Sequence, residues 1–260
     1  MKRTRIIAAF ILTMIAMTLM AGCIRVNIAD DSGPSVTKQY DFTGFTGIEI
    51  GNAFKVDITR SDNYSVTITI NEKIADRLTV NKIGDTLIIG LKEPIWNIHS
   101  RPQATITLPD LRSLDLSGAA EGIVKGFKSS NDFDLQVSGA SNLDIDMEAG
   151  DLKANVSGAS RANGYLKAAS SNIEVSGASR ITLTGSGGDI TIGVSGASQA
   201  NLENYAVANA DVELSGASQA NMDISGKLNA DLSGASHLEY GGKPAMGRVD
   251  TSGGSSIKPR

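Results

Sequence analysis

The chain has 260 residues, of which 41% are hydrophobic and 20% charged, so it can bury a sizeable core in one large domain or two small ones. Its formal net charge of −4, with no Lys/Arg cluster after Arg5, argues against nucleic acid as a partner. The 28 glycines follow neither the period of collagen nor the composition of a disordered chain, which favours an ordered, turn-rich β protein.

The N-terminal residues predict a lipoprotein signal peptide. Positive charges within the first five residues precede an uncharged run, 6–20, of typical signal-peptide length. Ala21 and Gly22 then stand immediately before Cys23, the only cysteine, and this arrangement resembles the lipobox at which bacterial lipoproteins are cleaved and acylated. We therefore expect residues 1–22 to be removed and Cys23 to carry the lipid. A secretory signal with an incidental cysteine, or an uncleaved membrane anchor, is the alternative.

An acylated Cys23 would anchor an exported protein to a bacterial membrane without a membrane-spanning helix. No later segment is long and apolar enough to span a bilayer. Ile24 follows the cysteine where Asp would resemble an inner-membrane retention signal, so the outer membrane or cell surface is expected. Residues 23–36 then form a lipidated tether.

Residues 37–110 alternate polar and apolar side chains strongly, as in GIEIGNAFKVDITRSDNYSVTITI. Gly84 and Asp85 favour a hairpin turn, and residues 73–78 favour one helical turn. An open solenoid end would expose unpaired strand edges. We therefore expect this segment to be an irregular β cap at the N-terminal end, continuous with the repeats that follow.

Residues 111–256 repeat one phrase, SGAS or a close variant. Its Ser-Gly pairs recur at intervals of 18 to 21 residues and begin at Ser117, Ser138, Ser157, Ser176, Ser195, Ser215, Ser233 and Ser252. A period near 20 residues is typical of a solenoid, in which stacked repeats together bury a core that one repeat could not bury alone. Apolar and polar residues alternate on both sides of the phrase, so each repeat holds two short strands.

Between those strands the phrase must turn the chain sharply, and glycine tolerates the positive φ that such a corner requires. The corner glycines are Gly118, Gly139, Gly158, Gly177, Gly196, Gly216 and Gly234. Identical corners favour an all-β fold, a right-handed parallel β-helix with coils of about 19 residues. Antiparallel hairpins are the alternative, but they would not need the same four residues at alternate turns.

Several stretches together resemble the putative auto-transporter adhesin, head GIN domain family. They are IEIGNAFKV at 48–56, the strands at 78–80 and 85–89, ITLP at 106–109 and the SGAS array, which together span about residues 45–255. The resemblance implies a bacterial surface or periplasmic lipoprotein with a β-helical fold. It carries no catalytic residues over to this chain.

Two outward positions after each SGAS corner carry polar side chains. The first position is Asn142, Arg161, Arg180, Gln199, Gln219 and His237, and the second is Asp144, Asn163, Thr182, Asn201, Asn221 and Glu239. Stacked in register, they would present a flat polar platform for hydroxyl-rich glycans. An ordinary solvated sheet face would carry similar residues.

The stretch EPIWNIHSRP interrupts this polar pattern with the only tryptophan of the chain. Trp96 and His99 could contact a sugar, and Arg101 an acidic group, so these three residues are the first candidates for a ligand contact. The structural alternative is that Trp96 and Ile98 plug the end of the solenoid.

The sequence offers little for catalysis or metal binding. Carboxylates that could serve a polysaccharide-processing enzyme are scattered over the repeats, at Asp134, Asp144, Asp146, Asp211 and Asp231. The two histidines, His99 and His237, lie far apart in sequence, and no cofactor motif is present.

We therefore expect a non-enzymatic, lipid-anchored cell-envelope protein that acts as a surface binding or adhesion module. Its candidate partners are the membrane, through acylated Cys23, and glycans or cell-envelope proteins. An envelope scaffold or stress-linked accessory protein is one alternative. A β-helix enzyme that processes polysaccharides is another, and a carboxylate cluster in a groove would favour it.

Overall fold

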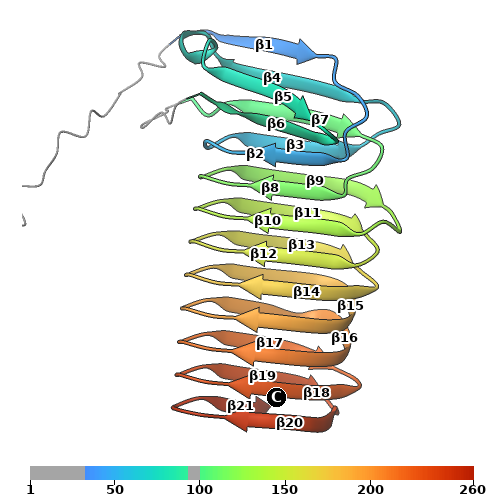
Figure 1. The fold of residues 1–260 in the computed structure, drawn as a ribbon, viewed down its shortest axis with the longest axis vertical. Helices are drawn as coiled ribbons and strands as arrows, with labels where there is room; N and C mark the ends of the chain where they lie inside the picture. The colour runs from blue at the N-terminus through green and yellow to red at the C-terminus, as the bar shows by residue number, and fades with distance from the viewer. Residues whose placement is uncertain (1–32, 93–99) are drawn as a thin grey trace, which may run out of the picture.

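The computed structural model of the chain describes residues 33–92 and 100–260, whose strands stack into a long rod (Figure 1). The N-terminal elements are β1 (Ser35–Tyr40), β2 (Gly47–Ile50), β3 (Lys55–Arg60), β4 (Ser65–Asn71), the 3₁₀ helix η1 (Glu72–Ile74), β5 (Leu78–Ile83), β6 (Thr86–Leu91) and β7 (Gln103–Leu108). The repeats hold β8 (Ser113–Leu116), β9 (Glu121–Lys128), β10 (Phe133–Val137), β11 (Asn142–Glu148), β12 (Leu152–Val156), β13 (Arg161–Lys167), β14 (Ser170–Val175), β15 (Arg180–Val194), β16 (Gln199–Leu214), β17 (Gln219–Ile224), β18 (Lys227–Leu232), β19 (His237–Gly242), β20 (Ala245–Thr251) and β21 (Ser256–Pro259).

Each coil of the rod places one strand on each of two faces. Face A consists of the strands that precede an SGAS corner, namely β8, β10, β12, β14, the second halves of β15 and β16, β18 and β20. Face B consists of the strands that follow it, namely β9, β11, β13, the first halves of β15 and β16, β17, β19 and β21. Neighbours on a face pair in parallel, and the coils wind in a right-handed sense (Figure 1). The predicted parallel β-helix with coils of about 19 residues is confirmed.

The SGAS corner is held together by backbone and serine hydrogen bonds between coils. At one corner, Gly177 has a φ of 78° and Ala178 N–H donates to Gly158 O over 2.8 Å. The second serine of the phrase is buried, and the N–H of Ser160 donates to Ser179 Oγ one coil further on, over 3.4 Å. The corners therefore form a column in which the backbone of one coil lies directly against the next.

The core is the narrow space between the two faces. Residues that flank the corner inside the rod are fully buried, as at Val156, Val175 and Ala162, whereas their neighbours along the strand are exposed. This period-two alternation gives every coil a layer of aliphatic side chains that packs on the layers above and below. The positions predicted to face inward after the corner, Leu143, Ala162, Ile181, Ala200, Ala220 and Leu238, are all buried.

The N-terminal end is closed by a cap whose spatial order differs from its order in the chain. β2 and β3 form the coil next to β8 and β9, and β6 and β7 lie on their other side. Beyond these, β4 pairs antiparallel with β7, β1 with β4, and β5 with β6. The change from parallel to antiparallel pairing ends the stack, as expected for a cap (Figure 1).

Details of the cap differ from the expected boundaries. Gly84 and Asp85 do join β5 to β6, since Ile83 is paired with Thr86. The helical turn expected at residues 73–78 is the 3₁₀ helix η1, which starts at Glu72 because Asn71 caps its N-terminus through a 2.9 Å bond from Lys73 N–H. The strand β1 begins inside the range expected for the tether. Among residues 33–92 and 100–260, no helix has the length and hydropathy needed to cross a bilayer.

Candidate functional site

The outer side of face B carries two polar ladders that run along the rod. Strand pairing aligns the first ladder as Asn142, Arg161, Arg180, Gln199, Gln219, His237 and Ser256, and the second as Asp144, Asn163, Thr182, Asn201, Asn221, Glu239 and Lys258. Each member lies one strand spacing, about 4.8 Å, from the next. The sequence-predicted ladders are therefore brought together in register, with exposed or half-buried side chains.

Three shallow hollows of 290 to 400 Å³ lie along these ladders. The first is lined by Lys55, Glu121, Asn142, Asp144, Arg161 and Asn163, the second by Arg180, Thr182, Gln199, Asn201, Gln219 and Asn221, and the third by Gln219, Asn221, His237, Glu239, Ser256 and Lys258. The last two share residues, and the first meets the second where Arg161 pairs with Arg180. We call these three neighbouring hollows together the face-B groove.

Side chains within the groove bond to one another along the ladder. Arg180 Nε donates to Gln199 Oε1 over 2.9 Å, and His237 Nδ1 lies 2.6 Å from Ser256 Oγ. The groove therefore offers amide, hydroxyl, imidazole and guanidinium groups, most of which can still bond a ligand.

Tyr165 adds an aromatic surface to the same face. It follows Arg161 and Asn163 on β13 at the next outward position, and it is 41% exposed. Tyr165 was missed from sequence, although the alternation along β13 already places it outward and an aromatic among polar neighbours is a signal for ligand stacking.

Arg101 and Pro102, at the end of the stretch that holds Trp96, lie beside the cap end of the groove. Arg101 is exposed and forms an ion pair with Glu121, which lines the first hollow. Lys55 N–H donates to Pro102 O over 2.9 Å, which fixes Pro102 beside the groove. Trp96 and His99, the other two predicted contacts, lie outside the described residues.

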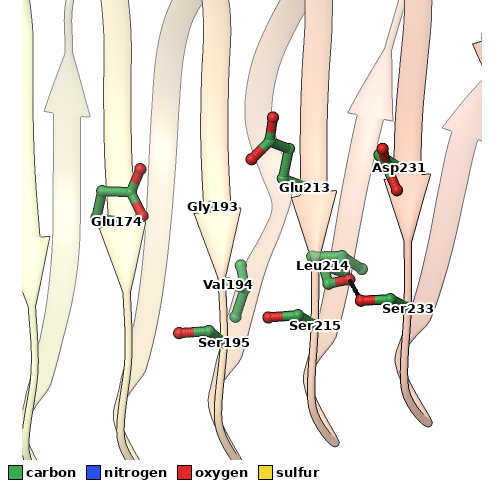
Figure 2. A pocket seen from close by; sticks show the side chains of 9 residues that line it. All are labelled: Glu174, Gly193, Val194, Ser195, Glu213, Leu214, Ser215, Asp231 and Ser233. Atoms are coloured by element: carbon green, nitrogen blue, oxygen red, sulfur yellow. Dashed lines mark hydrogen bonds between the residues drawn. The ribbon is translucent and has the colours of Figure 1, made fainter.

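A separate hollow lies on the opposite face of the rod, face A, around Gly193 (Figure 2). Its volume is 340 Å³ and it is lined by Glu174, Glu213 and Asp231, with serines from three corners. A side chain at Gly193 would clash with the Glu174 carboxylate, so the glycine leaves a gap in the ladder. In Figure 2 the carboxylates of Glu174 and Glu213 lean over this gap from the two neighbouring coils.

This acidic hollow was missed from sequence, because Glu174 and Glu213 were not among the carboxylates considered there. Asp231 alone of those lies in the hollow, whereas Asp134 faces Lys153 at 3.7 Å. Among residues 33–92 and 100–260, no group of three or more His, Cys, Asp or Glu side chains has the arrangement of a metal site.

Negative charge also accumulates on face A near the cap. Glu49 and Asp115 are register partners on adjacent coils, and Asp134 lies one coil further on. Burial raises the pKa of Asp115, and the charges of Glu49 and Asp134 raise that pKa further. Face A therefore carries acidic groups both near the cap and around Gly193, whereas face B combines carboxylates such as Asp144 with amides and arginines.

The fold has solved relatives in Parabacteroides and Bacteroides species. A putative lipid binding protein from Parabacteroides distasonis is similar with a TM-score of 0.83 and 16% identity, over 88% of this chain and 98% of that one. A putative adhesin from Parabacteroides merdae gives 0.82 and 17%, over 88% and 97%, and a putative adhesin from Parabacteroides distasonis gives 0.79 and 17%, over 88% and 98%. At these identities the likeness concerns the fold. No curated protein matches the chain.

Sequence comparison adds the family. Residues 44–244, which include the cap from β2 onward and most of the SGAS coils, match the family described as putative auto-transporter adhesin, head GIN domain. The match covers most of the chain and includes both faces of the rod, so we conclude that this chain belongs to the putative auto-transporter adhesin, head GIN domain family.

Proposed function

We propose that the protein is a non-enzymatic, lipid-anchored module of the cell envelope that binds polyhydroxylated glycan chains along the face-B groove. The two ladders of this groove carry the proposal. Asn and Gln side chains each offer two donors and an acceptor, which suits sugar hydroxyls that both donate and accept. Because the ladders repeat at the strand spacing, they present the same groups again and again to an extended polymer.

Membership in an adhesin family supports a surface role. Lipidation at Cys23 rests on the sequence, because that residue lies outside the described part of the chain. One structural neighbour is named a putative lipid binding protein, but polar side chains line most of the groove described here, with Ile123 as an exception, and this favours a glycan over an acyl chain.

A polysaccharide-processing enzyme is the second candidate, and the paired carboxylates of Glu174 and Glu213 favour it. A general acid in such enzymes needs a pKa raised by an apolar, enclosed site. Both side chains are exposed in an open hollow, which supports binding rather than catalysis. Release of reducing sugar ends from a polysaccharide panel, lost in Glu174→Gln, would favour the enzyme instead.

A glycan array probed with the full chain in detergent micelles tests the proposed function. We expect saturable binding that is lost in the face-B variant Asn201→Ala/Asn221→Ala. The matched control on face A, Asn155→Ala/Asn172→Ala, should bind as well as the unmodified protein. A Trp96→Ala variant reports whether this tryptophan contributes to binding. Loss of binding in both double variants would contradict the proposal. Capture of an envelope protein with no glycan binding would also contradict it, and would favour the envelope scaffold instead.

A further inference from the structure

Two arginines lie side by side at the centre of the face-B groove. Arg161 on β13 and Arg180 on β15 are register partners in consecutive coils, and both are exposed. Their Cα atoms are therefore separated by about one strand spacing, 4.8 Å. Like charges directly opposite each other on neighbouring strands are destabilising, so a bound anion would relieve the repulsion between the two guanidinium groups.

The described residues supply no carboxylate for this pair. Other arginines do have one within 4.0 Å, namely Arg60, Arg101, Arg112, Arg248 and Arg260. Among the described residues, neither Arg161 nor Arg180 has such a partner; Arg180 instead donates to the neutral Gln199. The nearest acidic member of the ladders, Asp144, is diagonal to Arg161 rather than opposite it. Two adjacent guanidinium groups thus remain available to an external anion.

The neighbours of the pair are suited to a sugar that bears the anion. Asn142 flanks Arg161 on the preceding coil, and Asn163 follows it on the same strand. Tyr165 lies two positions beyond Asn163, about 13 Å from Arg161 along an extended strand. A ligand that reaches both the arginines and the tyrosine is therefore longer than one sugar ring.

We propose that Arg161 and Arg180 form a subsite for the carboxylate groups of an acidic polysaccharide, and that Tyr165 stacks on a neighbouring sugar ring of the same chain. This inference rests on the proposed function of the face-B groove and specifies its ligand class. A guanidinium can bind a carboxylate through two parallel hydrogen bonds. A carboxylate of the ligand would therefore bind one arginine in this way or bridge both, and its negative charge would offset the repulsion between the two arginines.

Titration calorimetry of the full chain in detergent micelles, with galacturonic acid oligomers as the probe, tests this subsite. The methyl-esterified oligomers keep the rings but lose the charge, and we expect them to bind at least about tenfold more weakly.

Arg161→Gln and Arg180→Gln should each weaken binding of the acid form by about tenfold or more. Arg248→Gln, on face A, is the matched control and should leave it unchanged. Tyr165→Ala should weaken the acid and the ester to a similar extent, because stacking does not require the charge.

The outcomes separate the subsite from the groove. If the ester binds as tightly as the acid and the arginine variants match the control, the subsite is wrong while glycan binding by the groove stands. If no oligosaccharide, charged or neutral, binds, both proposals fail. If dextran sulfate competes as well as the acid oligomer, the surface is a general polyanion patch and the carboxylate assignment is overturned. Thermal melts check that each variant folds, and removing one arginine should leave the melting temperature equal or slightly higher.

Discussion

At the scale of single residues, the corner glycines meet a strict geometric demand that recurs in every coil. At Gly177 the φ of 78° is one that side-chain-bearing residues rarely adopt, and an added Cβ would lie 2.5 Å from Gly158 O in the neighbouring coil. We expect Gly177→Val to lower the free energy of unfolding by about 2–4 kcal/mol, from backbone strain and displacement of a coil. Urea denaturation measures the loss. Gly254→Val is the control, since its nearest heavy atom lies at 3.7 Å; equal losses in both variants would refute the corner argument.

Asp115 gives a pH-dependent prediction. Its pKa is raised in the folded state, so its carboxylate weakens the fold above that pKa, and the weakening vanishes below the unfolded value of about 3.9. We expect Asp115→Asn to be more stable than the unmodified protein at pH 7, by a few tenths of a kcal/mol because the site is partly solvated, and equally stable near pH 3. Melting curves at both pH values test this. A gain that persists at pH 3, or that Asp146→Asn reproduces, would remove Asp115 as the cause.

At the scale of elements, the coil is the unit that can be exchanged. Residues 138–156 form one complete repeat, and the strands on either side keep the same 19-residue register, as the bond from Ser141 N–H to Ser160 Oγ shows. Deleting this repeat should leave a folded, shorter rod, because each coil contacts mainly its neighbours. Circular dichroism and a cooperative melt would show it. Deletion of 139–147 alone should prevent folding, since it would place a face-A strand on face B.

The coils were predictable from sequence and the cap order was not. The repeated Ser-Gly pair predicts where each coil turns, and the alternation of polar and apolar residues predicts which side chains of each strand point inward. The buried residues of the coils therefore follow from local sequence patterns alone. The insertion of β6 and β7 between β2–β3 and the outer cap strands depends on long-range pairs such as Gly47 with Thr86 and with Ser113. No local pattern encodes that order, because alternating strands of similar length can pair in several ways.

The candidate site also has features that could be predicted from sequence and features that could not. The face-B ladders follow from the repeat, so their residues could be named in advance. The row of Glu174, Gly193 and Glu213 also follows from the repeat, because these residues are register partners in successive coils, but the hollow left by the missing side chain of Gly193 is visible only in the folded rod. The arginine pair was in the predicted ladder, but its lack of a carboxylate partner is visible only once the neighbouring coils are in place.

At the scale of the whole molecule, the two faces of the rod differ in charge and its two ends differ in structure. Face A carries the acidic hollow and face B carries the groove, while β1 lies at the capped end and β20 and β21 at the other (Figure 1). A lipid on Cys23 would therefore attach the rod by its capped end, with the groove extending away from the membrane.

The anchor itself is tested by Cys23→Ser. We expect this variant to leave the membrane fraction for the soluble fraction and to lose labelling by an alkyne fatty acid, because no other acylation site is proposed and acyl chains supply the membrane affinity. Its melting curve after purification should match that of the unmodified protein. Continued membrane association without label would refute lipidation at this residue.

The one-sided pairing of β1 has a mechanical consequence if the tether is anchored. Among the strands that the structure describes, β1 pairs only with β4, over Ser35 to Tyr40, whereas β2 is held by β6 on one edge and β8 on the other. A pull on the tether along the rod axis would peel β1 away one hydrogen bond at a time and release about 20 Å of chain. The load would then reach β2, which must break two edges at once. In optical tweezers, with handles at residues 24 and 260, we expect a small extension at low force well before the coils unravel. The first strand would thus yield under tension and spare the coils that carry the groove.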